Sequence, residues 1–193
     1  MTEVVVLIDG YFKNLSKTRC IAGPTITLIK DEERNILVDT GNPKDKEKIL
    51  KALAKHNLEP KDIDIVINTH FHPDHTGCNY LFNKSRFLTH GVAFWNDIFD
   101  RSKKLQEISN NVKIIPTPGH SEGSITILVK KDKKIIAIVG DLFWSEKDVK
   151  IGLLKEDCTD KKLFGKNRNK ILKIAEWIIP GHGKMFKVKK YIT

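Results

Sequence analysis

The segment Thr69-His70-Phe71-His72-Pro73-Asp74-His75-Thr76-Gly77 places three imidazoles and one carboxylate within six consecutive positions. Histidine is otherwise scarce, because the whole chain of 193 residues contains only seven. An apolar stretch from Ile63 to Ile67 runs directly into the segment, and we expect it to form a strand that ends there. The composition of the segment is typical of a metal site, because imidazole nitrogen and carboxylate oxygen are donors that zinc prefers.

Three further candidate ligands follow other apolar stretches of the chain. His120 and His182 each come after a Pro-Gly pair, and Asp141 comes after Gly140 at the end of an apolar run. Side chains at the ends of strands can converge from loops that are far apart in the sequence, on a rigid scaffold. We therefore expect these three residues to meet the histidine-rich segment in the folded protein.

Pro73 divides the histidine-rich segment into two parts. His70 and His72, two positions apart, can point the same way from an extended backbone. Pro73 ends that extended stretch, so Asp74 and His75 face a different direction. The natural division gives each of two ions its own ligands, with Asp141 as the bridge. We assign to one ion His70, His72 and His120, and to the other Asp74, His75 and His182.

We interpret this pattern as a hydrolytic site with two divalent metal ions, zinc first, with iron or manganese as alternatives. Two neighbouring ions can lower the pKa of a shared water to near neutrality and hold it as hydroxide. We expect Asp141 and Asp74 to be the catalytic residues. Asp141 would bridge the ions, and Asp74 would orient the hydroxide and pass a proton to the leaving group.

The remaining sequence predicts short strands and a few helices in one domain over residues 1–193, without linkers or repeats. Strands are expected at 4–8, 26–29, 36–38, 63–67, 86–89, 112–115, 124–129, 135–139 and 177–179. Helices are expected at 43–57, 77–82, 91–100 and 160–175, and an exposed connection or helix at 101–111.

Several residues with reactive or aromatic side chains have plainer structural interpretations. We expect Cys78 to be a small core residue and His56 a surface residue at the end of a helix. Phe94, with Trp95, is expected in the core. Trp144, Lys147 and Lys150 follow Asp141 closely, in the position of a loop that contacts the substrate, but an exposed loop with solvated lysines is the plainer expectation.

Composition restricts the partners and the compartment. The formal charge of +10 is compatible with anionic partners, although a lysine-rich surface that serves solubility is the plainer explanation. Three widely spaced cysteines without a CxxC pair favour a reducing compartment, so we expect a cytoplasmic protein. No apolar stretch reaches the ~18 residues of a membrane span. The sequence does not indicate the oligomeric state. We expect a homodimer as one possibility, because dimers are the most common soluble oligomers.

The motifs together resemble those of the metallo-β-lactamase superfamily. His70-x-His72-x-Asp74-His75, Pro118-Gly119-His120, Gly140-Asp141 and Pro180-Gly181-His182-Gly183 are similar in order and rough spacing, and so is the Val38-Asp39-Thr40-Gly41 turn. The resemblance extends from about residue 25 to residue 183. It implies an α/β fold, the αββα four-layer sandwich, in which two mixed β-sheets lie face to face between helices and the metals lie at one edge.

The resemblance leaves the substrate open, because members of this family cleave β-lactams, thioesters, lactones and phosphodiesters. The compact layout is similar to the metallo-β-lactamase domain-containing proteins and to the glyoxalase II group. Glyoxalase II has an additional C-terminal region that binds glutathione, and only eleven residues follow His182 here, so we do not expect a glutathione thioester.

Three functions remain, in this order. The first is a hydrolase that cleaves an ester, thioester or lactone bond in a small-molecule substrate, for which the basic charge would suit an anionic compound. The second is a phosphodiesterase or ribonuclease that acts on RNA. The third is a redox module that uses the same ligands to bind iron.

Overall fold

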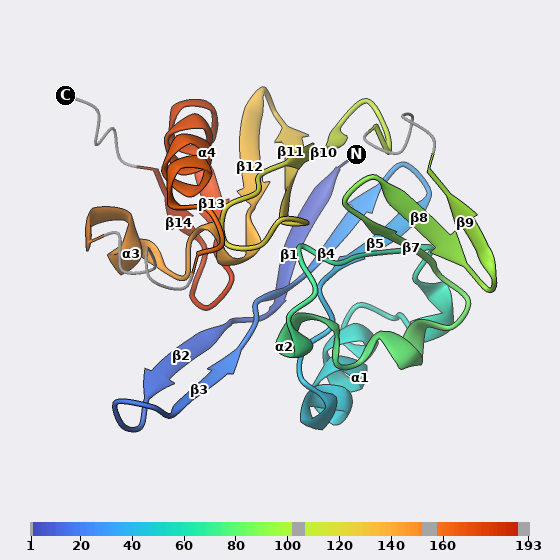
Figure 1. Cartoon of the computed structure of the whole chain (residues 1–193). Helices are drawn as coiled ribbons and strands as arrows, with labels where there is room; N and C mark the ends of the chain where they lie inside the picture. The colour runs from blue at the N-terminus through green and yellow to red at the C-terminus, as the bar shows by residue number, and fades with distance from the viewer. Residues whose placement is uncertain (1, 102–106, 152–157, 189–193) are drawn as a thin grey trace.

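The computed structural model describes residues 2–101, 107–151 and 158–188. Two β-sheets pack face to face, and helices cover their outer faces (Figure 1). The larger sheet consists of β1 (Glu3–Ile8), β4 (Ile26–Asp31), β5 (Arg34–Val38), β6 (Ile65–Ile67), β7 (Arg86–Thr89), β8 (Val92–Trp95) and β9 (Ile98–Asp100), in that order. The smaller sheet consists of β10 (Val112–Pro116), β11 (Ile125–Lys131), β12 (Lys134–Ile138), β13 (Trp177–Ile179) and β14 (Phe186–Lys187).

The helices form the two outer layers. A 3-10 turn at Pro43–Asp45 leads into α1 (Lys46–Ala54), whose Ile49 and Leu53 pack on the outer face of the larger sheet. On the smaller sheet, α4 (Lys161–Ile174) buries Phe164 and Ile171. The side chain of Asp160 caps α4 by accepting hydrogen bonds from the backbone amides of Lys162 and Leu163. The predicted four-layer αββα sandwich is therefore confirmed.

Successive residues of a strand face opposite sides of its sheet, so the apolar side chains fall into separate layers. In β4, Ile29 faces the space between the two sheets, whereas Ile26 and Leu28 face the layer that contains α1. In β11, Ile127 faces the same inter-sheet core and Leu128 faces α4. Both faces of each sheet are thus buried, which is the arrangement that these β-branched runs predict.

Strand direction brings the candidate ligands to one edge. β5, β6 and β7 run parallel in the larger sheet, and β12 runs parallel to β13 in the smaller sheet. β10 has the same direction as β12, because each is antiparallel to β11, which lies between them. In the smaller sheet, the segments that follow β10, β12 and β13 therefore begin at the same edge. The segment that follows β6 begins at the C-terminal end of its strand in the larger sheet.

The predicted helix at 91–100 is wrong. The structure has a β-hairpin there, in which Trp95 of β8 pairs with Ile98 of β9 across a two-residue turn. Asn96 in the turn has φ of +52°, a conformation that asparagine tolerates better than most residues. Phe94 stacks on Phe87 at the edge of the core, as expected of a packing residue. Of the predicted connection at 101–111, residues 102–106 lie outside the described residues.

Two further elements were not predicted. A hairpin of β2 (Tyr11–Asn14) and β3 (Cys20–Gly23) projects from the body of the molecule (Figure 1). The expected exposed loop after Asp141 instead contains the helix α3 (Glu146–Ile151), which includes Lys147 and Lys150. Trp144 is half-buried and packs on the smaller sheet's helical layer. In the described part of the chain, we find no helix with the length and apolarity that a membrane span requires.

Candidate metal centre

The fold gathers all seven candidate ligands at one edge of the sandwich. They form two groups, and within each group one donor atom per residue lies within 4.8 Å of the others. The first group is His70, His72, His120 and Asp141, and the second is Asp74, His75 and His182. The division matches the one that the sequence predicts from the position of Pro73.

Local backbone geometry explains how one segment contributes to both groups. After β6 the chain stays extended through His72, whose φ and ψ are −64° and 144°. Pro73 then begins the short helix α2 (Pro73–Thr76), since its ring fixes a φ suited to the first helical position. The change from extended to helical backbone separates His70 and His72 from Asp74 and His75.

Three imidazoles converge in the first group. The Nδ1 atom of His72 lies 3.0 Å from Nε2 of His70 and 3.0 Å from Nε2 of His120. His70 and His120 are buried, whereas His72 is exposed. The group therefore has its opening on the side of His72, where solvent reaches the donors.

Asp141 lies between the two groups. Its Oδ1 atom is 3.2 Å from Nε2 of His75 and 3.2 Å from Nε2 of His182. Its Oδ2 atom is 3.4 Å from Nε2 of His120 and 3.8 Å from Nε2 of His70. Nε2 of His182 also lies 3.3 Å from Oδ2, so this imidazole is close to both oxygens. The carboxylate of Asp141 is thus within reach of both groups, as a bridging ligand must be.

The donor set fits a metal centre better than a protein-only network. Nε2 of His75 and Oδ1 of Asp141 are buried and have no hydrogen-bond partner among the described residues. Buried polar atoms are nearly always paired, so atoms that lack a partner and face one another need an explanation. A cation held between the imidazole nitrogens and the carboxylate oxygens supplies it, and nitrogen and oxygen donors suit a divalent metal.

Residues behind the ligands hold two of the rings. Asp39 accepts hydrogen bonds of 2.8 Å from the backbone amide and the hydroxyl of Thr69, and its Oδ2 atom is 2.8 Å from Nδ1 of His75. His182 donates from Nδ1 to the carbonyl oxygen of Gly23 at 3.0 Å. Such contacts fix the ring and direct the other nitrogen at the metal position. The sequence indicated Asp39 only through its turn motif, and nothing in it indicated Gly23.

The charges of the ligands are strongly coupled. Burial by itself would lower the pKa of His75, but Asp39 and Asp141 outweigh it and raise that pKa well above its usual value. Burial would raise the pKa of Asp141, but His75 and His182 outweigh it and hold it well below its usual value. Burial and the charge of His75 lower the pKa of His70 well below its usual value. Because a metal binds an unprotonated imidazole nitrogen, we expect metal binding here to be coupled to proton release.

The other residues considered from the sequence lie outside both groups. Cys78 is fully buried in the apolar layer beneath α1 and donates from its thiol to the carbonyl oxygen of Asn42, at 3.1 Å. His56 is half-buried just after α1. Trp144 was expected on an exposed loop, yet its ring lies 5.4 Å from that of His182, centroid to centroid.

Comparisons with known proteins show which sequences this chain resembles. The family model described as "Metallo-beta-lactamase superfamily" matches residues 23–93. A probable metallo-hydrolase of Methanocaldococcus jannaschii is 35% identical over 156 residues, which cover 80% of this chain and 74% of that protein. An uncharacterized protein of Caenorhabditis elegans is 31% identical over 175 residues, and the match spans only 48% of its length.

Solved structures share the fold. A putative metallo-beta-lactamase of Thermotoga maritima superposes with a TM-score of 0.75 at 17% identity, covering 96% of this chain and 99% of that one. An N-acyl homoserine lactone hydrolase with its product at the catalytic metal centre gives 0.68 at 18% identity, covering 94% and 92%. The two sheets, the ligand set at their common edge and these similarities lead to one assignment: the chain belongs to the metallo-beta-lactamase superfamily.

Proposed function

We propose that the protein is a hydrolase that depends on two divalent metal ions, zinc in the first place, and that it cleaves an ester, thioester or lactone bond. The observation that carries the proposal is the position of Asp141, which lies between the two groups with Oδ1 beside His75 and Oδ2 beside His120. Such a carboxylate serves two ions, whereas one ion would leave half of the donors unused. The balanced reaction adds water across the acyl bond and yields a carboxylic acid and an alcohol or thiol, or a hydroxy acid from a lactone.

Each residue has a defined part in the proposed site. His70, His72 and His120 would hold one ion, Asp74, His75 and His182 the other, and Asp141 both. Bound ions would supply a nucleophile from water at neutral pH and would stabilise negative charge that develops on the substrate oxygen. These are the ordinary contributions of a dinuclear site in a hydrolase.

Asp74 is the more accessible of the two carboxylates in the site. Its side chain is 21% exposed, unlike Asp141 at 4%. Its Oδ2 atom lies 3.7 Å from Nε2 of His75 and 3.7 Å from Nε2 of His182. A carboxylate at the mouth of the site can accept a proton from the attacking water and deliver it to the leaving group.

The relatives support the reaction class. The archaeal relative is named a probable metallo-hydrolase, and one neighbour of the same fold is a lactone hydrolase with product at its metal centre. Fold alone does not select a substrate, so the acyl preference is tested against phosphodiesters and RNA. RNA cleavage by the metal-loaded protein, with binding that weakens steeply as salt rises, would replace the proposal by the nuclease alternative.

The experiment is a metal titration combined with a substrate panel. We expect two equivalents of zinc per chain and chelator-sensitive hydrolysis of esters, thioesters or lactones. His182→Ala is expected to lower the stoichiometry from two toward one and to reduce hydrolysis at least about a hundredfold, whereas His56→Ala, outside both groups, serves as the histidine control. Full hydrolysis by Asp141→Ala loaded with metal, or hydrolysis that survives chelation, would contradict the proposal.

A further inference from the structure

A row of three stacked phenylalanine rings crosses the larger sheet and ends at its outer strand. Phe87 of β7 is paired in register with Phe94 of β8, which is paired in register with Phe99 of β9. The ring centroids are 5.0 Å apart in the first pair and 5.8 Å apart in the second. Phe87 is buried and Phe94 is half-buried, but Phe99 is 65% exposed. The row therefore runs from the core outward and stops at a ring that lies largely in solvent.

β9 is the last strand of the larger sheet, and its outer side is exposed. It pairs with β8, and no other described strand pairs with it. Ile98, next to Phe99, is also 49% exposed. Figure 1 shows β9 at the margin of the molecule, on the side away from α3 and α4. Proteins commonly protect an edge strand with lysine, proline or a bulge, and β9 has none of these, so it is a template for pairing with another strand.

The backbone of Phe99 is oriented to pair outward. A two-residue turn joins β8 to β9, and in such a hairpin the flanking residues, here Trp95 and Ile98, form the hydrogen-bonded pair. Hydrogen-bonded and non-hydrogen-bonded pairs alternate along antiparallel strands, so the N–H and C=O groups of Phe99 point away from β8. A strand that lies beside β9 therefore meets a donor and an acceptor at the residue that carries the exposed ring.

The sequence of this edge is complementary to itself. When two antiparallel copies of β9 are aligned with Phe99 opposite Phe99, Asp97 of each copy lies opposite Arg101 of the other. Both of these residues are exposed. Opposite charges at facing positions stabilise paired strands, and like charges destabilise them. An alignment about Asp100 would instead place two aspartates opposite each other, so the charges favour the alignment about Phe99.

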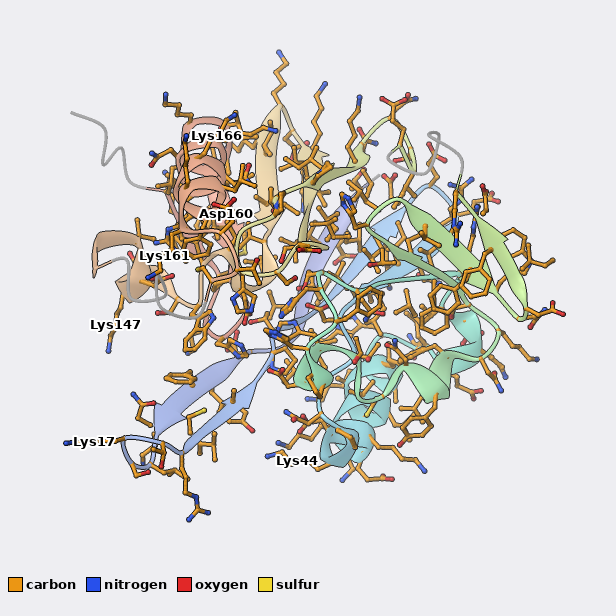
Figure 2. All side chains as sticks on the ribbon, in the orientation of Figure 1. Lys17, Lys44, Lys147, Asp160, Lys161 and Lys166 are labelled. Carbon is orange, nitrogen blue, oxygen red and sulfur yellow. The ribbon has the colours of Figure 1, made fainter. Side chains whose placement is uncertain are left out.

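The charge of this edge differs from that of the chain as a whole. A net charge of +10 makes two copies repel each other in most orientations. Residues 96–101 contain two aspartates and one arginine, which gives this edge a formal charge of −1. Figure 2 shows four labelled lysines on the side of the molecule away from β9: Lys17, Lys147, Lys161 and Lys166. Association through β9 keeps these lysines of the two copies apart.

We propose that two copies of the chain associate through β9, in antiparallel register about Phe99, so that their larger sheets become continuous. The row of stacked rings then extends across the interface from one copy into the other, and an Asp97–Arg101 pair lies at each end of the contact. The contact is isologous, because the same residues serve both copies. So short a strand buries less than the roughly 1,200 Å² of a standard interface, and we expect a weak dimer with a Kd on the order of 10 µM.

The two metal centres stay separate in this dimer. β7 is parallel to β6 and β9 has the same direction as β7, so β9 ends at the edge of the sheet where the segment with His70 begins. Because the two copies of β9 are antiparallel, their metal centres lie at opposite edges of the joined sheet. Neither copy contributes a residue to the other's site, so the dimer can be tested independently of hydrolysis.

The first test measures molar mass against concentration. Sedimentation of the wild-type chain between about 1 and 300 µM should show reversible conversion from monomer to dimer. Phe99→Lys places a cation at the centre of the interface and should weaken association at least about tenfold. Leu15→Lys, the matched control, changes another exposed apolar residue, on the hairpin β2–β3, and should leave association unchanged. A wild type that remains monomeric throughout, or equal weakening by the two variants, would overturn the proposal.

The second test reverses charges to examine the register. Asp97→Lys sets two cations against each other at both ends of the contact, and Arg101→Asp sets two anions against each other. Each variant alone should therefore associate about tenfold more weakly than the wild type. An equimolar mixture of the two variants places opposite charges at both ends, and we expect a heterodimer with an affinity close to that of the wild type. Damage to the folding of a single chain cannot produce such recovery, and a mixture that associates no better than its components would refute the register.

Discussion

Arg168 offers the clearest prediction about stability, because it is a buried cation that ties α4 to the segment carrying Asp141. The residue is 7% exposed. Nη1 donates to the carbonyl oxygen of Leu142 and to Oδ2 of Asp148, and Nη2 donates to the carbonyl oxygen of Asp148, each at 2.7 Å. The guanidinium also lies over the ring of Phe143, 4.0 Å from its centroid.

We expect Arg168→Met to cost about 3 kcal/mol of unfolding free energy. Methionine keeps much of the aliphatic packing but leaves the carboxylate of Asp148, 1% exposed, without its guanidinium. Removal of one partner of a buried ion pair typically costs about 3–5 kcal/mol, and Asp148 keeps the backbone amide of Trp144 as a donor, which favours the lower end. For a chain of this size the loss corresponds to a Tm lower by about 6–12 °C.

The assay measures the unfolding free energy of the wild type and the variants by denaturant. A second arginine–aspartate pair, at the surface, serves as the control. Arg86 and Asp100 form a similar bridge, 2.9 Å long, with side chains 40% and 31% exposed. Arg86→Met should therefore cost less than about 1 kcal/mol. The double variant Arg168→Met with Asp148→Asn should recover part of the loss, because the buried charge is gone. Equal losses at the two arginines, or a loss below 1 kcal/mol at Arg168, would refute the reasoning.

Three other predictions concern the metal site and the response to acid. Asp39→Asn preserves the left-handed backbone at this position, φ +58°, but removes the charge beside His75, so we expect about 10–100-fold weaker zinc binding in a chelator competition. Zinc at a hundred times its Kd should stabilise the protein by about 2.7 kcal/mol, seen as a Tm increase that chelator reverses; an unchanged Tm would contradict a folded-state site. Burial would raise the pKa of Asp31, but hydrogen bonds from Ser109, Thr2 and Asn111 prevail and lower it below the ordinary value of 3.8. The stabilising effect of Asp31 is therefore present above that ordinary value and is lost as the pH falls through the lowered pKa. Acid titration of unfolding free energy should accordingly show a smaller decline below about pH 4 in Asp31→Asn than in the wild type.

The sequence was sufficient to predict that the candidate ligands come together, because their positions follow from simple backbone rules. Strand ends before His70, Asp141 and His182 could be placed from β-branched runs, and Pro73 predicted the change of direction within the segment. Each of these signals is local, and the fold brings them together through parallel strands whose ends lie at one edge.

The predictions that failed concern segments whose secondary structure depends on contacts with distant parts of the chain. Residues 91–100 have apolar spacing that suits either a helix or two short strands, and the Asn96–Asp97 pair between them is composed of residues that favour turns. The hairpin β2–β3 has only short apolar stretches, Tyr11–Phe12 and Cys20–Ala22, on either side of a polar turn around Lys17, so it lacks a clear strand pattern. Trp144 was assigned to a loop because its partner, Phe12, is distant in the sequence and belongs to that unpredicted hairpin.

The candidate ligands come from both sheets, so the geometry of the site depends on how the two sheets pack against each other. The loop after β6 in the larger sheet supplies four donors, and segments after strands of the smaller sheet supply the other three. Ile67, Ile138 and Ile179, the last residues of β6, β12 and β13, belong to one buried cluster between the sheets. Their packing sets how far Asp141, from one sheet, stands from His70 and His75 of the other. Because packed cores resist deformation, the spacing of the two ligand groups is held by a region that contains no ligand.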